Sequence, residues 1–181
     1  RSKVMEDDLY ALPQYYLGKR ILITGASGYI AWNLIKTLVS FECSIICLSR
    51  CVPTIDLWSE FASVRWIEAQ YDDQEEILRA VQNVDIIFHL ASQTSAYVAE
   101  EDPLDDYIAN VRPMQLLLEG CRITNNSPLI VFAGTSTQCG LPRQLPVNEL
   151  IVDEPITTYD FHKLQAERWL KFYIRQEWAS G

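Results

Sequence analysis

The stretch LITGASGYIAWNL, residues 22–34, contains the turn that decides the fold. Its first residues belong to a short apolar run, KRILITG (19–25), that predicts a buried strand. From Ser27 onward the apolar residues recur at helical spacing, which predicts a helix through about Ser40. A glycine-containing turn therefore connects a strand directly to a helix.

Three small residues in this turn each have a stereochemical use. Gly25 permits a tight turn, Gly28 lets the backbone approach a bound pyrophosphate, and Ala31 allows the helix to pack closely on the strand. The helix N-terminus then presents its backbone N–H groups and the positive end of its dipole to the phosphates. The turn therefore predicts a dinucleotide site, and the alternative is a plain strand-to-helix connection.

Strands alternate with helices along the rest of the chain. Four further strands are predicted at 44–49, 64–69, 84–91 and 128–134, and four of the five strands are nearly all apolar. Helical patterns occupy 72–82, 102–122 and 158–178, and residues 139–158 are expected to form a long loop. Asp102 is expected to cap the second of these helices, and Pro113 predicts a kink or break in it near Arg112. Strands that are almost entirely apolar and alternate with helices are typical of an α/β fold with a doubly wound parallel sheet.

Length, composition and charge limit the possible partners. The chain has 181 residues, 49% of them hydrophobic, and a net charge of −9, which suits one packed domain but not a nucleic-acid phosphate backbone. No apolar run approaches the roughly 20 residues of a membrane span. The five cysteines form no CxxC pair and there are only two histidines, so we expect no metal site. A cytoplasmic protein with reduced thiols is expected.

A tyrosine and a lysine, Tyr159 and Lys163, are four residues apart at the start of the last predicted helix. On a helix they share a face, so the ammonium can lie near the phenol and lower its pKa. A phenolate can take a proton from a hydroxyl group while hydride leaves the carbon that bears this hydroxyl. Tyr15 and Lys19 have the same spacing, but Gly18 separates them, which does not favour a shared helix face. The alternative for Tyr159 and Lys163 is a surface pair on a packing helix.

These motifs together resemble the extended short-chain dehydrogenase/reductase family, which includes NAD(P)-dependent nucleotide-sugar epimerases and dehydratases. TGASGYIA (24–31) matches the family's TGxxGxxG opening except at Ala31. Four more segments resemble later family motifs: VDIIFHLAS (84–92), DPLDDYIANV (102–111), VFAGTSTQCG (131–140) and LPVNELIVDEPITTYDFHK (145–163). The resemblance covers about residues 19–178 and implies a Rossmann fold, with residues 1–18 as an N-terminal extension and 19–181 as the NAD(P)-binding domain.

The resemblance also implies the roles of individual residues. Tyr159 would be the catalytic base, Lys163 its electrostatic partner and Thr135 the anchor of the substrate hydroxyl, while Cys139 replaces a tyrosine that is usual in the family. The residues expected to bind the cofactor are Gly25, Ser27, Gly28, Tyr29, Ile30, Ser49, Arg50, Gln70, Tyr71, Leu90, Ala91, Ser92, Asn110, Tyr159 and Lys163.

The end of the second predicted strand bears on the choice of cofactor. Sites that prefer NAD usually carry an acidic residue there, which binds the ribose 2′-hydroxyl. This chain has Ser49 and Arg50 instead. Arg50 can pair with a 2′-phosphate, which favours NADP(H), and the alternative is an exposed arginine after a strand. Gln70 is expected near the adenine amino group.

The resemblance implies an epimerase or reductase that acts on a nucleotide sugar. Dehydration is less favoured, because Thr135, Ser136 and Thr137 replace the acid-containing triplet of the family's dehydratases. The family's C-terminal substrate lobe is expected to be absent from this chain, and a homodimer through helices near 103–122 and 158–178 is expected. Two other functions stay open: a cofactor-binding sensor or scaffold without catalysis, and a reductase of small carbonyl compounds.

Overall fold

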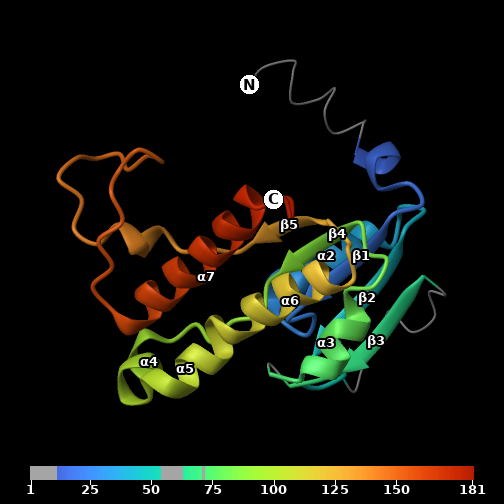
Figure 1. The fold of residues 1–181 in the computed structure, drawn as a ribbon, viewed down its shortest axis with the longest axis horizontal. Helices are drawn as coiled ribbons and strands as arrows, with labels where there is room; N and C mark the ends of the chain where they lie inside the picture. Colours follow the sequence, from blue (N-terminus) through green and yellow to red (C-terminus); the bar gives the residue numbers. More distant parts are fainter. Residues whose placement is uncertain (1–11, 54–62, 71) are drawn as a thin grey trace.

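The computed structural model describes residues 12–53, 63–70 and 72–181, which form a five-stranded sheet flanked by helices (Figure 1). The strands are β1 (Arg20–Thr24), β2 (Ser44–Ser49), β3 (Val64–Glu68), β4 (Ile86–His89) and β5 (Leu129–Phe132). The helices are α2 (Tyr29–Leu38), α3 (Gln74–Ala80), α4 (Ala96–Glu101), α5 (Pro103–Asn110), α6 (Arg112–Ile123) and α7 (Thr158–Arg175), and η1 (Ser136–Cys139) is a 3-10 helix.

The strand order is β3-β2-β1-β4-β5, and every neighbouring pair is parallel. The first strand, β1, lies at the centre of the sheet. The next two strands, β2 and β3, lie on one side of it, and β4 and β5 lie on the other side. Ligands of such sheets bind where the direction of winding changes, outside the carboxyl ends of the strands. Here that position lies between β1 and β4. The doubly wound parallel fold expected from the sequence is confirmed.

Helices cover both faces of the sheet (Figure 1). On one face the buried Ala31, Ile35 and Leu38 of α2 pack in a cluster with alternate residues of β1. On the other face α3, α6 and α7 share a second cluster with Leu22 and Ile87. Because β1 is buried on both sides, its three central residues Ile21, Leu22 and Ile23 are all apolar instead of alternating with polar residues.

The long helix expected over 102–122 is divided at Val111. The helix α5 ends at Asn110, and α6 begins at Arg112 with Pro113 in its first turn. Proline cannot donate a backbone hydrogen bond inside a helix, but it fits the first turn of a new one. The break predicted near Arg112 is therefore confirmed.

A short helix, α4, precedes this pair and was not expected. The Ser95 hydroxyl caps it by accepting from the Val98 N–H group at 3.4 Å. Ala99 is its one buried residue, so the segment lacks the apolar periodicity that reveals longer helices. The next cap was predicted correctly, since the Asp102 carboxylate accepts from the Asp105 N–H group at 3.0 Å.

Two segments lie outside the sheet, one before β1 and one between η1 and α7. Residues 12–16, within the expected N-terminal extension, are helical. Residues 140–157, between η1 and α7, form only turns and irregular backbone, and Figure 1 shows this orange segment extending away from the sheet. The predicted long loop is thus present, but η1 at its start was not expected.

After α7 the backbone returns to the outer edge of β5. Ser180 forms a parallel bridge with Leu129, and the Ile130 N–H group donates to the Ser180 carbonyl at 2.7 Å. The last residues of α7 and the turn after it are thereby tied to the edge of the sheet.

The glycine turn provides a test of the fold. Gly25 has φ +67°, and a Cβ atom there would lie 2.7 Å from both Cα and N of Ala91. Gly25→Ala should therefore lower the free energy of unfolding by about 2 kcal/mol or more. Gly134→Ala is the matched control, because its Cβ would meet nothing within 4 Å. Chemical denaturation of the two variants measures both values, and equal losses would contradict the close approach.

Candidate functional site

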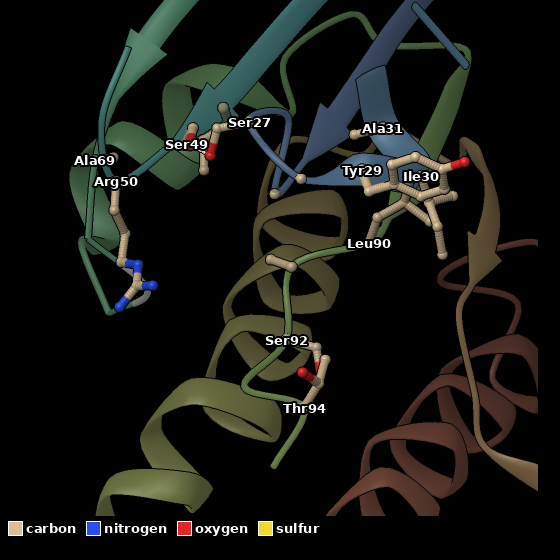
Figure 2. A pocket seen from close by; sticks show the side chains of 14 residues that line it. Ser27, Tyr29, Ile30, Ala31, Ser49, Arg50, Ala69, Leu90, Ser92 and Thr94 are labelled. Carbon is tan, nitrogen blue, oxygen red and sulfur yellow. Dashed lines mark hydrogen bonds between the residues drawn. The ribbon is translucent and has the colours of Figure 1, made fainter. Parts of the chain in front are cut away.

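A cavity of about 510 Å³ lies over the glycine turn, at the carboxyl ends of the strands (Figure 2). The turn, the end of β2 and the loop after β4 form its walls. The cavity brings together predicted cofactor residues that are distant in sequence: Gly25, Ser27, Gly28, Tyr29, Ile30, Ser49, Arg50, Leu90, Ala91 and Ser92. The lining also includes Ala31, which was expected to pack on the strand, and three residues that sequence reasoning missed, Leu48, Ala69 and Thr94.

The start of α2 forms one wall of this cavity. Gly28 is the N-cap of the helix, and no side chain caps the helix there. The first N–H groups of α2 are therefore left to other acceptors. A Cβ on Gly28 would lie 3.1 Å from the Gly25 carbonyl oxygen, so the turn is tightly closed. Exposed N–H groups at a helix N-terminus fit the pyrophosphate of a dinucleotide.

The end of β2 forms the opposite wall. The hydroxyl oxygens of Ser27 and Ser49 are 2.7 Å apart, which ties the glycine turn to this strand. Arg50 follows, and Figure 2 shows its side chain at the end of the cavity away from Tyr29. Arg50 also lines a second cavity of about 370 Å³ together with Gln70. Gln70 therefore lies near Arg50 without lining the main cavity, whereas Tyr71 falls outside the described residues.

Ser92 is held in place by a buried asparagine. The Ser92 hydroxyl donates to Oδ1 of Asn110 at 2.6 Å, and Nδ2 of Asn110 donates to the Gln93 carbonyl at 3.1 Å. Asn110 is buried in α5 and lies behind the cavity lining. It orients the loop after β4 rather than forming the wall itself.

Tyr159 lies in the first turn of α7, half-buried and hydrogen-bonded to Ser92. Burial raises the pKa of its phenol, the Ser92 hydrogen bond lowers it in part, and the charges of Asp160 and Asp106 raise it further. The spacing of Tyr159 and Lys163 predicted that the ammonium would lower this pKa. In the structure the phenol is instead held protonated, because burial and two carboxylates outweigh the favourable contact.

Lys163 lies one turn further along α7 and is almost fully buried. Its Nζ atom is 4.3 Å from the ring centre of Phe132 on β5. Burial lowers its pKa to about 8, although the negative charge of Asp106 acts in the opposite direction. Burial and Lys163 together lower the pKa of His89 to about 3, so this histidine on β4 is neutral.

Thr135 is connected to the same helix turn by a different route. Its hydroxyl lies 2.6 Å from that of Thr137, which in turn donates to the Asp160 carboxylate. Thr135 lines a third cavity of about 340 Å³, with Gln138 and Glu167 among its neighbours, and not the cavity over the glycine turn. The first turn of α7 is thus linked both to the lining of the glycine-turn cavity, through Ser92, and to η1, through Thr137.

Sequence reasoning missed one buried pair in this region. Nδ1 of His162 lies 2.6 Å from Oδ2 of Asp106, and both side chains are buried between α5 and α7. The two residues are 56 positions apart and lie in two different motifs, neither of which predicts a contact with the other. No local signal in the sequence could have paired them.

Two features are absent from the described residues. No group of three or more His, Cys, Asp or Glu side chains in residues 12–53, 63–70 and 72–181 is placed to hold a metal ion. Over the same ranges, no helix combines the length and apolar character that a membrane crossing requires.

Comparison with known proteins identifies relatives of the whole described fold. The model of the NAD dependent epimerase/dehydratase family matches residues 21–180. A putative UDP-glucose 4-epimerase of Methanocaldococcus jannaschii is 24% identical over 159 residues, which is 86% of this chain and 51% of that protein. The UDP-glucose 4-epimerase of Azospirillum brasilense is 27% identical over 160 residues, covering 84% of this chain and 44% of its own length. The chain thus spans about half the length of the curated relatives it matches.

Solved structures share the fold. A UDP-Glc/GlcNAc 4-epimerase from Campylobacter jejuni superimposes with a TM-score of 0.81 at 24% identity, over 88% of this chain and 50% of that one. MoeE5, solved with UDP-glucose and NAD, gives a TM-score of 0.77 at 22% identity, also over 88% of this chain and 50% of its own. Since the family model matches nearly all of the sequence, the resemblance inferred from the motifs is confirmed. The chain belongs to the NAD-dependent epimerase/dehydratase family.

Proposed function

We propose that this chain binds NAD(P) in the cavity over the glycine turn and forms the catalytic part of an enzyme that epimerises or reduces a nucleotide sugar. Tyr159 is the base, Lys163 its electrostatic partner and Thr135 the anchor of the substrate hydroxyl. One observation carries the proposal: the cavity over the glycine turn is lined by Ser92, and Ser92 is also the hydrogen-bonding group that lowers the pKa of Tyr159. The names of the curated relatives support the substrate class. When bound, the nicotinamide supplies the hydride acceptor and donor.

The raised pKa of Tyr159 bears on its role. A phenol that holds its proton donates it when a keto group is reduced to an alcohol, and it accepts the proton back in the reverse reaction. An epimerisation at one carbon needs both directions.

The choice between the two nicotinamide dinucleotides depends on the end of β2. Ser49 and Arg50 line the cavity where NAD-preferring sites usually place an acidic residue. A guanidinium can bind a 2′-phosphate in a bidentate manner, so we propose that NADP(H) is preferred. Because MoeE5 was solved with NAD, the affinities for NAD and for NADP both need to be measured.

The burial of Lys163 supports a catalytic role. A lysine that is 2% exposed destabilises the fold, because its charged form loses hydration. Groups with strongly shifted pKa values are concentrated at functional sites. We therefore attribute the retention of this buried ammonium to its place beside Tyr159.

A second copy of the chain is the partner proposed for the outer face of α7. Phe161, Trp169 and Phe172 are exposed there and line a shallow cavity of about 410 Å³. Clustered exposed aromatic residues are typical of protein interfaces. The homodimer stays a prediction.

Tyr159→Phe tests catalysis against the sensor function. In the native protein, assayed with UDP-glucose and UDP-N-acetylglucosamine, kcat should fall by about 10²- to 10⁴-fold, since the variant lacks the proton-transferring hydroxyl. Cofactor affinity, measured by calorimetry, should change less than about twofold, because a binding site keeps its other contacts. Tyr97→Phe, at an exposed position of α4, is the control. Turnover equal to wild type in Tyr159→Phe would reject the proposed mechanism.

Arg50→Ala tests the cofactor preference. We expect NADP⁺ affinity to fall about tenfold or more while NAD⁺ affinity changes little, because a charge-assisted contact contributes about 1.5–3 kcal/mol. Arg65→Ala, at an exposed position of the edge strand β3, should leave both affinities unchanged. Isothermal titration with each cofactor gives the ratio, and parallel losses for both cofactors would contradict the assignment.

Lys163→Met should stabilise the fold at neutral pH by about 2 kcal/mol, because it removes a buried charge. The pKa of Lys163 is about 8 in the folded chain and 10.5 in its ordinary state, so the unfolded state binds more protons between these values. Wild-type stability should therefore rise relative to the variant from pH 8 to pH 10.5, where the difference should vanish. Chemical denaturation of both proteins across this pH range measures the difference in their free energies of unfolding. A difference that does not change with pH would contradict the shifted pKa of Lys163.

A further inference from the structure

Asp106 is a fully buried carboxylate that the proposed mechanism does not use. Its side chain is 0% exposed, and both of its oxygens are engaged. Oδ2 lies 2.6 Å from Nδ1 of His162, while Oδ1 accepts from Asn110 at 2.8 Å and from Gln93 at 3.2 Å. A buried carboxylate is costly unless its hydrogen bonds are complete, and here three polar partners surround it.

The partners of Asp106 are the groups that hold Tyr159 in place. His162 lies on α7 between Tyr159 and Lys163, so this contact fixes the first turns of that helix against α5. Asn110 accepts from Ser92, the residue that hydrogen-bonds the phenol. One carboxylate therefore supports the tyrosine from two directions, through its helix and through its hydrogen-bond partner.

The charge of Asp106 also acts on both Tyr159 and Lys163, which are called the Tyr159–Lys163 couple below. It raises the pKa of Tyr159, which favours the protonated phenol, and it raises the pKa of Lys163, which favours the ammonium. Asp106 and Lys163 are both buried, so the interaction between their charges is only weakly screened.

The other charged groups around the start of α7 have different positions. Asp160, on α7 itself, also raises the pKa of Tyr159, but its carboxylate is bonded to the hydroxyls of Thr137 and Thr157. From α4, the exposed Glu100 accepts from the Thr158 N–H group at 2.7 Å. On β4, His89 is neutral.

More distant charges face other parts of α7. Glu119 of α6 accepts from the Tyr173 hydroxyl at 3.1 Å and pairs with Arg122, several turns beyond the couple. At η1, the Gln138 amide donates to Glu167 at 2.9 Å. Among the described carboxylates, Asp106 is thus the one that acts on both Tyr159 and Lys163.

We propose that Asp106 is a positioning residue for the Tyr159–Lys163 couple. It fixes α7 through His162, orients Ser92 through Asn110 and provides the negative charge that keeps the buried ammonium protonated. This inference rests on the proposed function for its meaning in catalysis. A purely structural carboxylate would join α5 to α7 and leave the titration of the couple unchanged.

The test follows the titration of Tyr159 directly. In the chain labelled with 3-fluorotyrosine, the ¹⁹F resonance that disappears in Tyr159→Phe identifies the residue. Asp106→Asn keeps an oxygen that can accept from Asn110 but removes the charge, so the pKa of the residue-159 phenol should fall by about half a unit or more. Glu101→Gln, an exposed carboxylate on the neighbouring α4, should produce no shift. An unchanged titration in Asp106→Asn would reject the proposal.

A second variant covers the possibility that Asp106→Asn does not fold. Ser92→Ala changes a loop side chain and removes the hydroxyl that links Asn110 to the phenol. Because that hydrogen bond lowers the pKa of Tyr159, its loss should raise the pKa by about half a unit. A phenol that titrates as in wild type would show that the Asn110 route does not reach Tyr159.

The two proposals can fail separately. The fluorine titration needs neither cofactor nor turnover, so its result does not depend on the reaction. If the native enzyme is active, Asp106→Asn should move both limbs of the pH profile of kcat/KM to lower pH, because Tyr159 and Lys163 both lose the same negative charge. A reduced kcat/KM whose pH profile keeps the apparent pKa values of the wild type would indicate that Asp106 has a structural role alone.

Discussion

The close approach of the Gly25 backbone to Ala91 is the constraint on which the rest of the structure depends. A side chain at position 25 would overlap the Ala91 backbone, so only glycine lets the tips of β1 and β4 meet. The Thr24 hydroxyl fastens the same junction, because it accepts from the Ala91 N–H group at 3.1 Å and lies 2.7 Å from Nδ1 of His89. The loop that follows carries Ser92, and through Ser92 the junction determines where the phenol of Tyr159 lies.

The site combines two kinds of environment that oppose each other energetically. The glycine turn and the sheet are apolar and stabilise the fold, whereas Lys163 and Asp106 bring charges into the interior. Natural proteins commonly give up stability at the positions where chemistry takes place. The three polar partners of Asp106 limit that cost, and Lys163 retains contact with the face of the Phe132 ring.

Structural features that depend on neighbouring residues in the sequence could be predicted, whereas contacts that depend on the packing of distant segments could not. Gly25 and Gly28 revealed the turn because a strand pattern precedes them and a helical pattern follows, and Pro113 revealed the break between α5 and α6. The short α4 lacks periodicity, and the His162–Asp106 contact joins segments that no motif connects. The direction of the Tyr159 pKa was also missed, because it depends on burial, which spacing alone does not give.

The single bridge between Ser180 and Leu129 pairs only the first part of β5 on its outer side. The strand β5 is last in the sheet order, so beyond this bridge its outer margin continues without another strand among the described residues. Val131, in the middle of β5, is 41% exposed and apolar. Uncovered margins of this kind are templates on which a strand from another molecule can add. The outer margin of β5 therefore offers unpaired backbone groups along which a further strand can pair edge to edge.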